Sequence, residues 1–257
     1  MSPVRAEGTL PEHAVLHKAW TRFLQHALDQ SAGGVLRAPP RIPDVVLSRS
    51  GYLEHFPHQI LSVPRRGTGL GESLTPAACL HVYPRLQGTE TAFYATWICG
   101  ECTRFEGGKW EAPYRLKTFH MLEFVSVGKP DAVQTARTRL TAALEEAFAQ
   151  LRLGGRMHNA TDAFFLGQNE GARLMQQLKG LKKEYRVQDS EASVALASVN
   201  YHEDHFARRF DIRADGAPAH SFCAAFGLDR LTTFGLRTWG PDPSRWPHAL
   251  AQYAAIP

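Results

Sequence analysis

The chain has 257 residues, of which 44% are hydrophobic and 21% are charged. This balance is typical of a globular protein and excludes a disordered or coiled-coil chain. The formal net charge of +4 suits an anionic ligand or an acidic partner, but it is too small to indicate nucleic-acid binding. No apolar run approaches the ~18 residues that a membrane span needs, and the N-terminus has no apolar signal core. We expect one cytoplasmic domain over residues 1–257, with its four cysteines not in disulfides.

The first predicted elements are a helix and a short strand. Apolar residues at helical spacing predict a helix over 11–31, which ends at Gly33-Gly34. A strand at 35–38 follows, and Pro39-Pro40 stops it because proline cannot donate to a sheet. Residues 41–72 are rich in glycine, proline, arginine and serine, which favours loops with short strands.

The middle of the chain is rich in β-formers. It predicts strands at 81–83, 92–99 and 119–127, and the last two are expected to form an antiparallel pair with a long connection. Pro130 then opens the clearest helix, over 130–151, whose apolar residues share one face.

The C-terminal part alternates between the two element types. A basic helix is predicted over 171–186, followed by strands at 192–200 and 208–213 and a helix at 228–236. Antiparallel strands with flanking helices indicate the α+β class.

Cys99-Gly-Glu-Cys102 is the first candidate for chemistry. A CxxC pair in a cytosolic chain is a redox pair, half of a zinc site or a pair of ordinary strand-end cysteines. Neither a second CxxC nor a thioredoxin-like βαβ pattern accompanies it, which favours the ordinary cysteines.

Two further patterns contain arginine. Arg104-Phe-Glu106 places a cation and a carboxylate on one strand face, with Phe119 on the returning strand available to stack a base; alternatively the two charges form a surface ion pair. In the second pattern Gly227 permits close ligand approach, and Arg230 at a helix start offers a bidentate phosphate contact or is a surface residue after a turn.

These patterns resemble the three signature motifs of class II aminoacyl-tRNA synthetases, the seryl branch most of all. They occur in the same order along the chain: a helix, a strand and a proline, then an Arg-x-Glu hairpin, then Gly-x-x-Arg before a helix. A narrower resemblance is to amino acid:carrier protein ligases, truncated homologues of the atypical zinc-dependent seryl-tRNA synthetases. The segments that carry it are Arg49-Ser-Gly51-Tyr52-Leu-Glu-His-Phe56-Pro57, Asp162-Ala-Phe164-Phe165-Leu-Gly167 and His220-Ser-Phe-Cys223. The resemblance covers about residues 12–237 and implies a class II synthetase-like catalytic domain with an antiparallel sheet.

The resemblance implies an active-site zinc held by Cys79, Glu123 and Cys223. Two thiolates and one carboxylate leave a fourth tetrahedral position open, and in this family the substrate's amino group fills it. The alternatives are that Cys79 and Cys223 are small buried residues, or that all four cysteines form one site.

The resemblance also implies an ATP site. Arg104 would bind the α-phosphate and the amino acid carboxylate, and Arg230 would hold the γ-phosphate. Glu106 would accept from the adenine amino group while Phe119 stacks on the ring. Asn200 would contact substrate or ATP. Magnesium would bridge the phosphates, with Glu203 or Asp204 as carboxylates that help to hold it.

Two departures from the family pattern stand out. Phe222 precedes Cys223 where a small residue is expected, which suggests a reshaped amino acid pocket. The loop after Glu106 also differs, and its Lys109 and Trp110 are expected to alter the ATP lid or the entry of the acceptor.

The acceptor is inferred from what the sequence lacks. Only residues 1–10 precede the first predicted helix, and the small net charge fits poorly with a tRNA grip, so we expect no tRNA-binding domain. An acidic carrier protein with a phosphopantetheine thiol fits better, and the basic helix suits docking of such a partner. The docking residues are expected to be Arg173, Lys179, Lys182 and Lys183, unless that helix only presents a solvated face.

The sequence therefore predicts a ligase. By analogy with the family, it would be a homodimer through the helix–strand–proline motif at 11–40. It would activate a small amino acid with ATP and pass the aminoacyl group to the carrier thiol. One alternative passes the adenylate to a small-molecule amine instead. Another is a binding paralogue that kept the fold and lost turnover.

Overall fold

A mixed seven-stranded sheet organises the computed structural model, which describes residues 11–28, 32, 34–64, 67, 71–105, 110–160, 179–190 and 192–254. The strand order is β1-β4-β5-β11-β8-β7-β6. The bounds are β1 (Val35–Arg37), β4 (Phe93–Thr103), β5 (Thr118–Gly128), β6 (Arg156–Asn159), β7 (Lys182–Asp189), β8 (Ala192–Glu203) and β11 (His220–Gly227). Only the β1–β4 pair is parallel among these strands, and the predicted antiparallel pair of β4 and β5 is confirmed.

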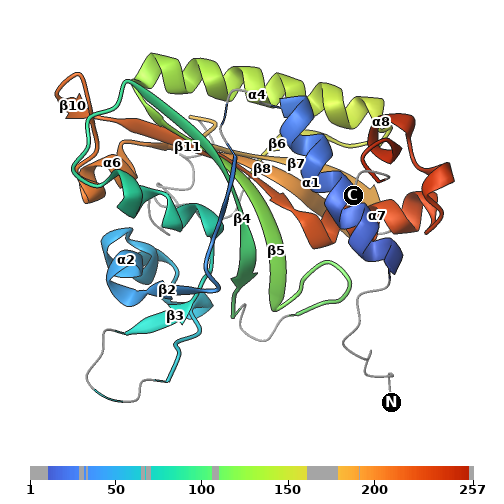
Figure 1. Ribbon diagram of the computed structural model, residues 1–257, viewed down its shortest axis with the longest axis horizontal. Helices are drawn as coiled ribbons and strands as arrows, with labels where there is room; N and C mark the ends of the chain where they lie inside the picture. The colour runs from blue at the N-terminus through green and yellow to red at the C-terminus, as the bar shows by residue number, and fades with distance from the viewer. Residues whose placement is uncertain are drawn as a thin grey trace.

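The long helices cover one face of this sheet (Figure 1). The long helices are α1 (Pro11–Leu28), α4 (Pro130–Gln150) and α7 (Leu228–Trp239), and the short helix α8 (His248–Ala251) lies with them. Trp20 of α1 and Phe148 of α4 pack edge to face, with ring centroids 6.2 Å apart, in the core beneath them. The helices predicted near 11–31, 130–151 and 228–236 are thus confirmed, with shifted ends.

Short elements cover the opposite face, on the left of Figure 1. They are the α-helices α2 (Asp44–Arg49), α3 (Tyr52–His55) and α6 (His205–Phe210), and the 3₁₀ turns η1 (Pro57–Gln59), η2 (Ala78–His81) and η3 (Tyr83–Leu86). The remaining elements of the described residues are two small antiparallel pairs and one 3₁₀ turn. The pairs are β2 (Arg41–Pro43) with β3 (Glu72–Leu74) and β9 (Arg213–Ala214) with β10 (Ala217–Pro218), and the turn is η4 (Pro243–Arg245). Residues 41–72 therefore contain two helices that the prediction of loops and strands missed.

Two predicted strands are wrong. Residues 81–83 lie in the 3₁₀ turns η2 and η3, because Pro84 in the first turn of η3 favours a turn and cannot donate to a sheet. The first half of the strand predicted at 208–213 belongs to the helix α6, which buries Phe206, Ala207 and Phe210. Spacings of three and four residues are those of a helix face.

The basic helix predicted over 171–186 is wrong from Lys182 onward, where the chain forms β7. Leu181 and Tyr185 suggested a helical stripe, but a spacing of four also satisfies the two-residue period of a strand. The burial of Tyr185 and Val187 confirms the strand period. Residues 171–178 lie outside the described residues.

The fold is α+β, as the sequence predicts, because the antiparallel part of the sheet carries helices on one face and short elements on the other. Within the described residues, no helix has the length and apolar character needed to cross a membrane.

Candidate active site

A cavity of about 960 Å³ lies over the sheet face that carries Cys223. Its floor includes Glu123 of β5, Asn200 of β8 and Cys223 of β11. Because residues from Ser193 to Asn200 of β8 line it, the cavity extends along that strand for about 20 Å. This length can hold an extended ligand with chemically different ends.

Cys79, Glu123 and Cys223 meet at the floor of this cavity. Each side chain offers one possible metal ligand atom, all within 4.8 Å of one another, and all three residues are buried. The structure therefore brings together the three residues predicted to hold a metal.

Sheet register and one turn create this cluster. Cys223 pairs with Val125 of β5, and Ala225 pairs with Glu123, so strand alternation turns Cys223 and Glu123 to the same face. The turn η2 brings Cys79 above them, and the Ala78 N–H donates a 2.8 Å hydrogen bond to Oε1 of Glu123.

The electrostatics of the cluster fit a bound cation. Burial raises the pKa of Glu123, although hydrogen bonds from Cys79 and from the Ala78 backbone oppose it. A hydrogen bond to Cys223, burial and the charge of Glu123 raise the pKa of Cys79 well above its usual value. Neighbouring buried anions disfavour each other, and a divalent cation would reverse this by stabilising the thiolate and the carboxylate.

Two polar side chains surround Cys223. Asn200, opposite it on β8, lies with Nδ2 3.4 Å from its Sγ. Asn200 Oδ1 is buried and has no hydrogen-bond partner among the described residues, so an acceptor is left for a ligand. His202 Nε2 lies 3.7 Å from the same sulfur, and burial with the charges of His205 and Arg137 lowers the pKa of His202 to about 3. His202 was not predicted as a site residue, because a histidine one strand position beyond Tyr201 carries no motif of its own.

Cys99 and Cys102 lie on β4, three residues apart, so their side chains leave the strand on opposite faces. Cys102 is buried in the core that contains Cys79 and Cys223, whereas Cys99 is half-buried against the helices. Neither belongs to a metal-ligand cluster in the described ranges. A site built from all four cysteines is thereby excluded.

Arg104 and Phe119 line the cavity side by side. The Arg104 guanidinium lies 5.3 Å from the centroid of the Phe119 ring, and its Nε donates to the Pro76 carbonyl at 2.7 Å. β4 ends at Thr103, so Arg104 directly follows the strand, and its predicted shared face with Glu106 stays a prediction. Glu106 and Lys109 lie outside the described residues.

Arg230 enters the cavity from the first turn of α7. Its Nε donates to the Tyr114 carbonyl at 2.8 Å and its Nη1 to the Ala195 carbonyl at 3.1 Å. Tyr114 belongs to the connection between β4 and β5, in which residues 111–116 also line the cavity. The expectation that Lys109 and Trp110 of this connection alter the ATP lid or the entry of the acceptor stays a prediction, because Lys109 lies outside the described residues and Trp110 is not among the residues that line the cavity.

Phe222 does not shape the cavity. It packs against Phe124 in the core beneath the helices, with ring centroids 5.7 Å apart, because it alternates with Cys223 along β11. The expectation that Phe222 reshapes the amino acid pocket is therefore wrong.

The predicted docking residues separate in the structure. Lys182 lies on β7, lines the cavity and pairs with Glu184 at 3.4 Å, so it does not belong to an outer helix face. Lys179 pairs with Glu203 at 2.9 Å in the turn before β7, and Lys183 follows on the strand. Arg173 lies outside the described residues.

The carboxylates considered for magnesium are also elsewhere. Glu203 pairs with Lys179, and Asp204 pairs with Arg208 at 2.7 Å. Neither lines the cavity, whereas Glu184 and Asp189 of β7 do. Glu184 fell within the predicted helix 171–186 and Asp189 beyond its end, so neither was a predicted site residue.

Comparison with known proteins identifies the family. No family model matches the chain. Amino acid–acyl-carrier-protein ligase 2 of Bradyrhizobium diazoefficiens is 33% identical over 245 residues, which cover 84% of this chain and 73% of that protein. The chain belongs to the amino acid–acyl-carrier-protein ligase family. Ligase 1 of the same organism is 32% identical, over 82% of this chain and 73% of that protein. This ligase family is the one that the sequence motifs predicted.

More distant relatives of this ligase are synthetases. The type-2 serine–tRNA ligase of Methanopyrus kandleri is 26% identical over 71% of this chain and 37% of that protein. The solved M. kandleri seryl enzyme in complex with tRNASec has a TM-score of 0.82, with 20% identity over 98% of this chain and 57% of that chain. The Pyrococcus horikoshii seryl-tRNA synthetase complexed with ATP has a TM-score of 0.78, with 18% identity over 96% of this chain and 56% of that chain. The ligase thus spans less than two thirds of these proteins and shares the class II seryl-synthetase catalytic fold, as predicted.

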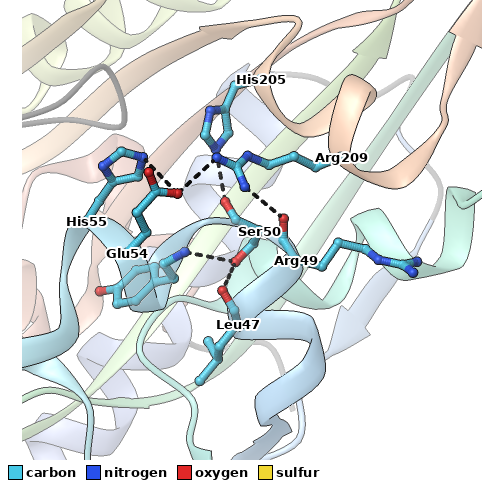
Figure 2. A network of polar contacts seen from close by, with 8 residues as sticks. Leu47, Arg49, Ser50, Glu54, His55, His205 and Arg209 are labelled. Atoms are coloured by element: carbon cyan, nitrogen blue, oxygen red, sulfur yellow. Dashed lines mark hydrogen bonds and ion pairs between the residues drawn. The ribbon is translucent and has the colours of Figure 1, made fainter.

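A polar network fixes one wall of the ligase cavity (Figure 2). Arg209 of α6 donates to Glu54 at 3.2 Å and to the Arg49 carbonyl at 3.4 Å, and His205 Nε2 lies 2.9 Å from the Ser50 carbonyl. These contacts join α6 to the α2–α3 segment. Tyr52 and Phe56 from that segment line the cavity, so the network positions its wall.

Proposed function

We propose that this ligase activates a small amino acid with ATP as an aminoacyl adenylate and transfers the aminoacyl group to the phosphopantetheine thiol of an acidic carrier protein. The observation that carries the proposal is the buried Cys79–Glu123–Cys223 cluster in the same cavity as Arg104 and Arg230. The names of the Bradyrhizobium relatives support the carrier as acceptor, and the ATP complex of the P. horikoshii synthetase supports the nucleotide.

The cluster fits Zn²⁺. Two thiolates and one carboxylate are usual zinc ligands, and three protein ligands leave one tetrahedral position for a substrate. When bound, zinc would supply a Lewis acid that binds the free amine of an α-amino acid. Asn200 supports this assignment because its unpartnered Oδ1 lies on the side chain that contacts Cys223, where it can accept from that amine.

Arg104 and Arg230 neutralise charge in the proposed first step. A carboxylate oxygen of the amino acid attacks the α-phosphorus of ATP, a P–O bond forms, and the bond to the bridging oxygen breaks to release pyrophosphate. Arg104 holds the attacking carboxylate and the α-phosphate, while Arg230 holds the γ-phosphate. Such a site acts by in-line positioning and electrostatic stabilisation.

Phe119 stacks on the adenine in this proposal, and Glu106 accepts from its amino group. The contact between Arg104 and the Phe119 ring supports their placement, because it brings the phosphate-binding cation beside the proposed base platform. Magnesium accompanies the ATP phosphates, and Glu184 and Asp189 are carboxylates of the cavity that can bind it or its water.

The second proposed step needs no protein nucleophile. The carrier thiolate attacks the carbonyl carbon of the adenylate, a C–S bond forms, and the C–O bond to AMP breaks. The thiol proton leaves to solvent. Lys179 and Lys183, with Arg173, remain the proposed docking cations for the acidic carrier.

A homodimer is part of the proposal. β1 is an edge strand of the sheet, and Val35 on it has 37% of its surface exposed. An open edge with an exposed apolar side chain is a site that proteins commonly cover. Sedimentation equilibrium would return the mass of two chains if the proposal holds and that of one chain if it does not.

The decisive experiment is amino-acid-dependent ATP–pyrophosphate exchange across the standard amino acids, on protein with assayed zinc content. We expect exchange with one or two small amino acids, lost in Cys223→Ala and kept in Cys99→Ala. Loading of a phosphopantetheinylated carrier then tests the acceptor. Exchange without loading would favour a small-molecule amine as acceptor, and ATP binding without exchange would favour a non-catalytic paralogue.

A further inference from the structure

A second cluster of metal-ligand types lies outside the cysteine site. His17 of α1, His120 of β5 and Asp229 of α7 each offer one ligand atom, and these atoms lie within 4.8 Å of one another. His120 leaves β5 on the face opposite Phe119 and Glu123, because strand residues alternate. His120 therefore lies on the sheet face opposite the cysteine cluster, whereas Asp229, at the start of α7, also lines the cavity.

His17 is the unusual member of this cluster. Its Nε2 atom is buried and has no hydrogen-bond partner in the part of the chain that the structure describes. Leaving a buried polar atom unsatisfied is costly, and native proteins usually give it a partner. The His17 ring contacts the His120 ring edge to face, with centroids 5.2 Å apart, so the unpaired nitrogen belongs to a ring that lies within a group of ligand types.

Asp229 and His120 already contact each other, so both can bind the same ion without a large movement. Oδ2 of Asp229 accepts a 2.5 Å hydrogen bond from the His120 backbone N–H and lies 3.5 Å from its Nδ1. Glu101 pairs directly with His120 across β4 and β5, which adds negative charge beside the cluster. This acidic environment favours a cation.

We propose that His17, His120 and Asp229 bind a divalent transition-metal ion, with Zn²⁺ the best match, at a site separate from the cysteine cluster. Two imidazole nitrogens and one carboxylate oxygen are suitable zinc ligands, whereas magnesium and calcium prefer sets made of oxygen alone. The His120 side chain is 48% exposed, so an ion can enter from solvent and keep water in its fourth position.

The site would brace the nucleotide end of the cavity. The three ligands come from three different elements. His120 directly follows Phe119 in the sequence, and Asp229 directly precedes Arg230. A bound ion would fix α1, β5 and α7 relative to one another. The inference rests on its own ligands and does not depend on the proposed ligase chemistry.

Cobalt separates the two sites in one titration. The full chain without an affinity tag is titrated with Co²⁺, because a thiolate site gives an intense sulfur-to-metal charge-transfer band and a site of nitrogen and oxygen ligands does not. In the Cys79→Ser/Cys223→Ser variant we expect one bound Co²⁺ without that band. His17→Gln and Asp229→Asn should each abolish this binding, whereas His26→Gln on the same helix should retain it.

A stability measurement gives a second readout. Zn²⁺ at a hundredfold excess over its Kd should raise the Tm of the Cys79→Ser/Cys223→Ser variant by at least about 4 °C, and His17→Gln should remove the rise. If the double cysteine variant does not fold, His17→Gln alone should lower the metal content of the otherwise unchanged chain by one equivalent while the thiolate band remains.

Absence of Co²⁺ from the double cysteine variant, or binding unchanged by both His17→Gln and Asp229→Asn, would overturn the proposal. Absence of the thiolate band when the unchanged chain is titrated would count against the cysteine site only. Failure of the cysteine site and failure of the His17–His120–Asp229 site can therefore be told apart.

Discussion

The backbone N–H of Ala78 donates a 2.8 Å hydrogen bond to Oε1 of Glu123, which joins the turn η2 to strand β5 at the floor of the cavity. The carboxylate is buried and its orientation is fixed by a donor that no side-chain substitution removes. Glu123 is thus held beside Cys79 before any metal binds.

Replacement of Glu123 by glutamine tests this arrangement. The amide can still accept from Ala78, but it removes the anionic ligand, so we expect zinc content to fall and kcat/KM for pyrophosphate exchange to drop by at least about a hundredfold. Glu101→Gln, on the neighbouring strand β4, is the matched control and should change neither. Full zinc content with unchanged exchange in Glu123→Gln would remove Glu123 from the site.

The two arginines of the cavity are expected to need their planar guanidinium groups. Arg230→Lys keeps the charge, but a single amine must replace the planar guanidinium group. That group now donates to both the Tyr114 and the Ala195 carbonyls. We expect exchange to fall by about 10²–10³ for Arg230→Lys and for Arg104→Lys, measured as kcat/KM for ATP. Exposed Arg85→Lys is the control. Full activity in both cavity variants would refute their proposed phosphate contacts.

The elements that the sequence predicted well are those with one dominant signal. α4 begins with proline and has a long apolar face, and β4 and β5 contain runs of β-formers, so local preference and burial agree. The helix predicted over the start of β7 was wrong because a spacing of four residues serves a helix and a strand alike, and only packing against neighbours decides between them. The strand predicted at 208–213 was wrong because two of the three buried residues of α6, Phe206 and Ala207, precede that range.

The site was predictable in its residue types but not in its geometry. The resemblance supplied Cys79, Glu123 and Cys223, whereas their shared face depends on the register between β5 and β11. A one-residue slip would turn one of them to the helices, and the pairing of strands this far apart in the chain is not predictable from one sequence alone. The same alternation makes Phe222 a core residue and not a pocket residue.

A substitution at Gly51 tests the role of the α2–α3 segment, which forms one wall of the cavity. Its φ of +78° lies in the left-handed region, and a Cβ there would lie 3.0 Å from Cζ of Arg209. Gly51→Ala should therefore lower the free energy of unfolding by about 1 kcal/mol from backbone strain, with a further loss as Arg209 is displaced from Glu54. Because Tyr52 and Phe56 line the cavity, KM for the amino acid should rise as well.

Gly216→Ala is the control for that variant. Gly216 has a φ of +75°, and a Cβ there would meet nothing within 4 Å, so its substitution costs the backbone strain alone. Thermal unfolding of both variants separates the two contributions. Equal losses of stability in the two variants would show that displacing Arg209 does not lower the free energy of unfolding. The network would then not stabilise the cavity wall.

The same network predicts a dependence of stability on pH through His205. Burial, with the charges of Arg209 and His55, lowers the pKa of His205 in the folded chain, although the Ser50 carbonyl and Glu54 oppose this. The unfolded chain binds a proton near the ordinary pKa of about 6.5, whereas the folded chain resists it. His205 therefore contributes stability above that pH, and the contribution is lost as the pH falls toward the lowered pKa.

His205→Gln should flatten that dependence. Urea unfolding between about pH 7.5 and pH 5 would show a smaller fall in the free energy of unfolding for the variant than for the unchanged chain, because one proton uptake on unfolding is removed. Exposed His158→Gln on β6 should leave the slope as it was. An unaltered slope in His205→Gln would mean that His205 binds protons equally in the folded and the unfolded chain.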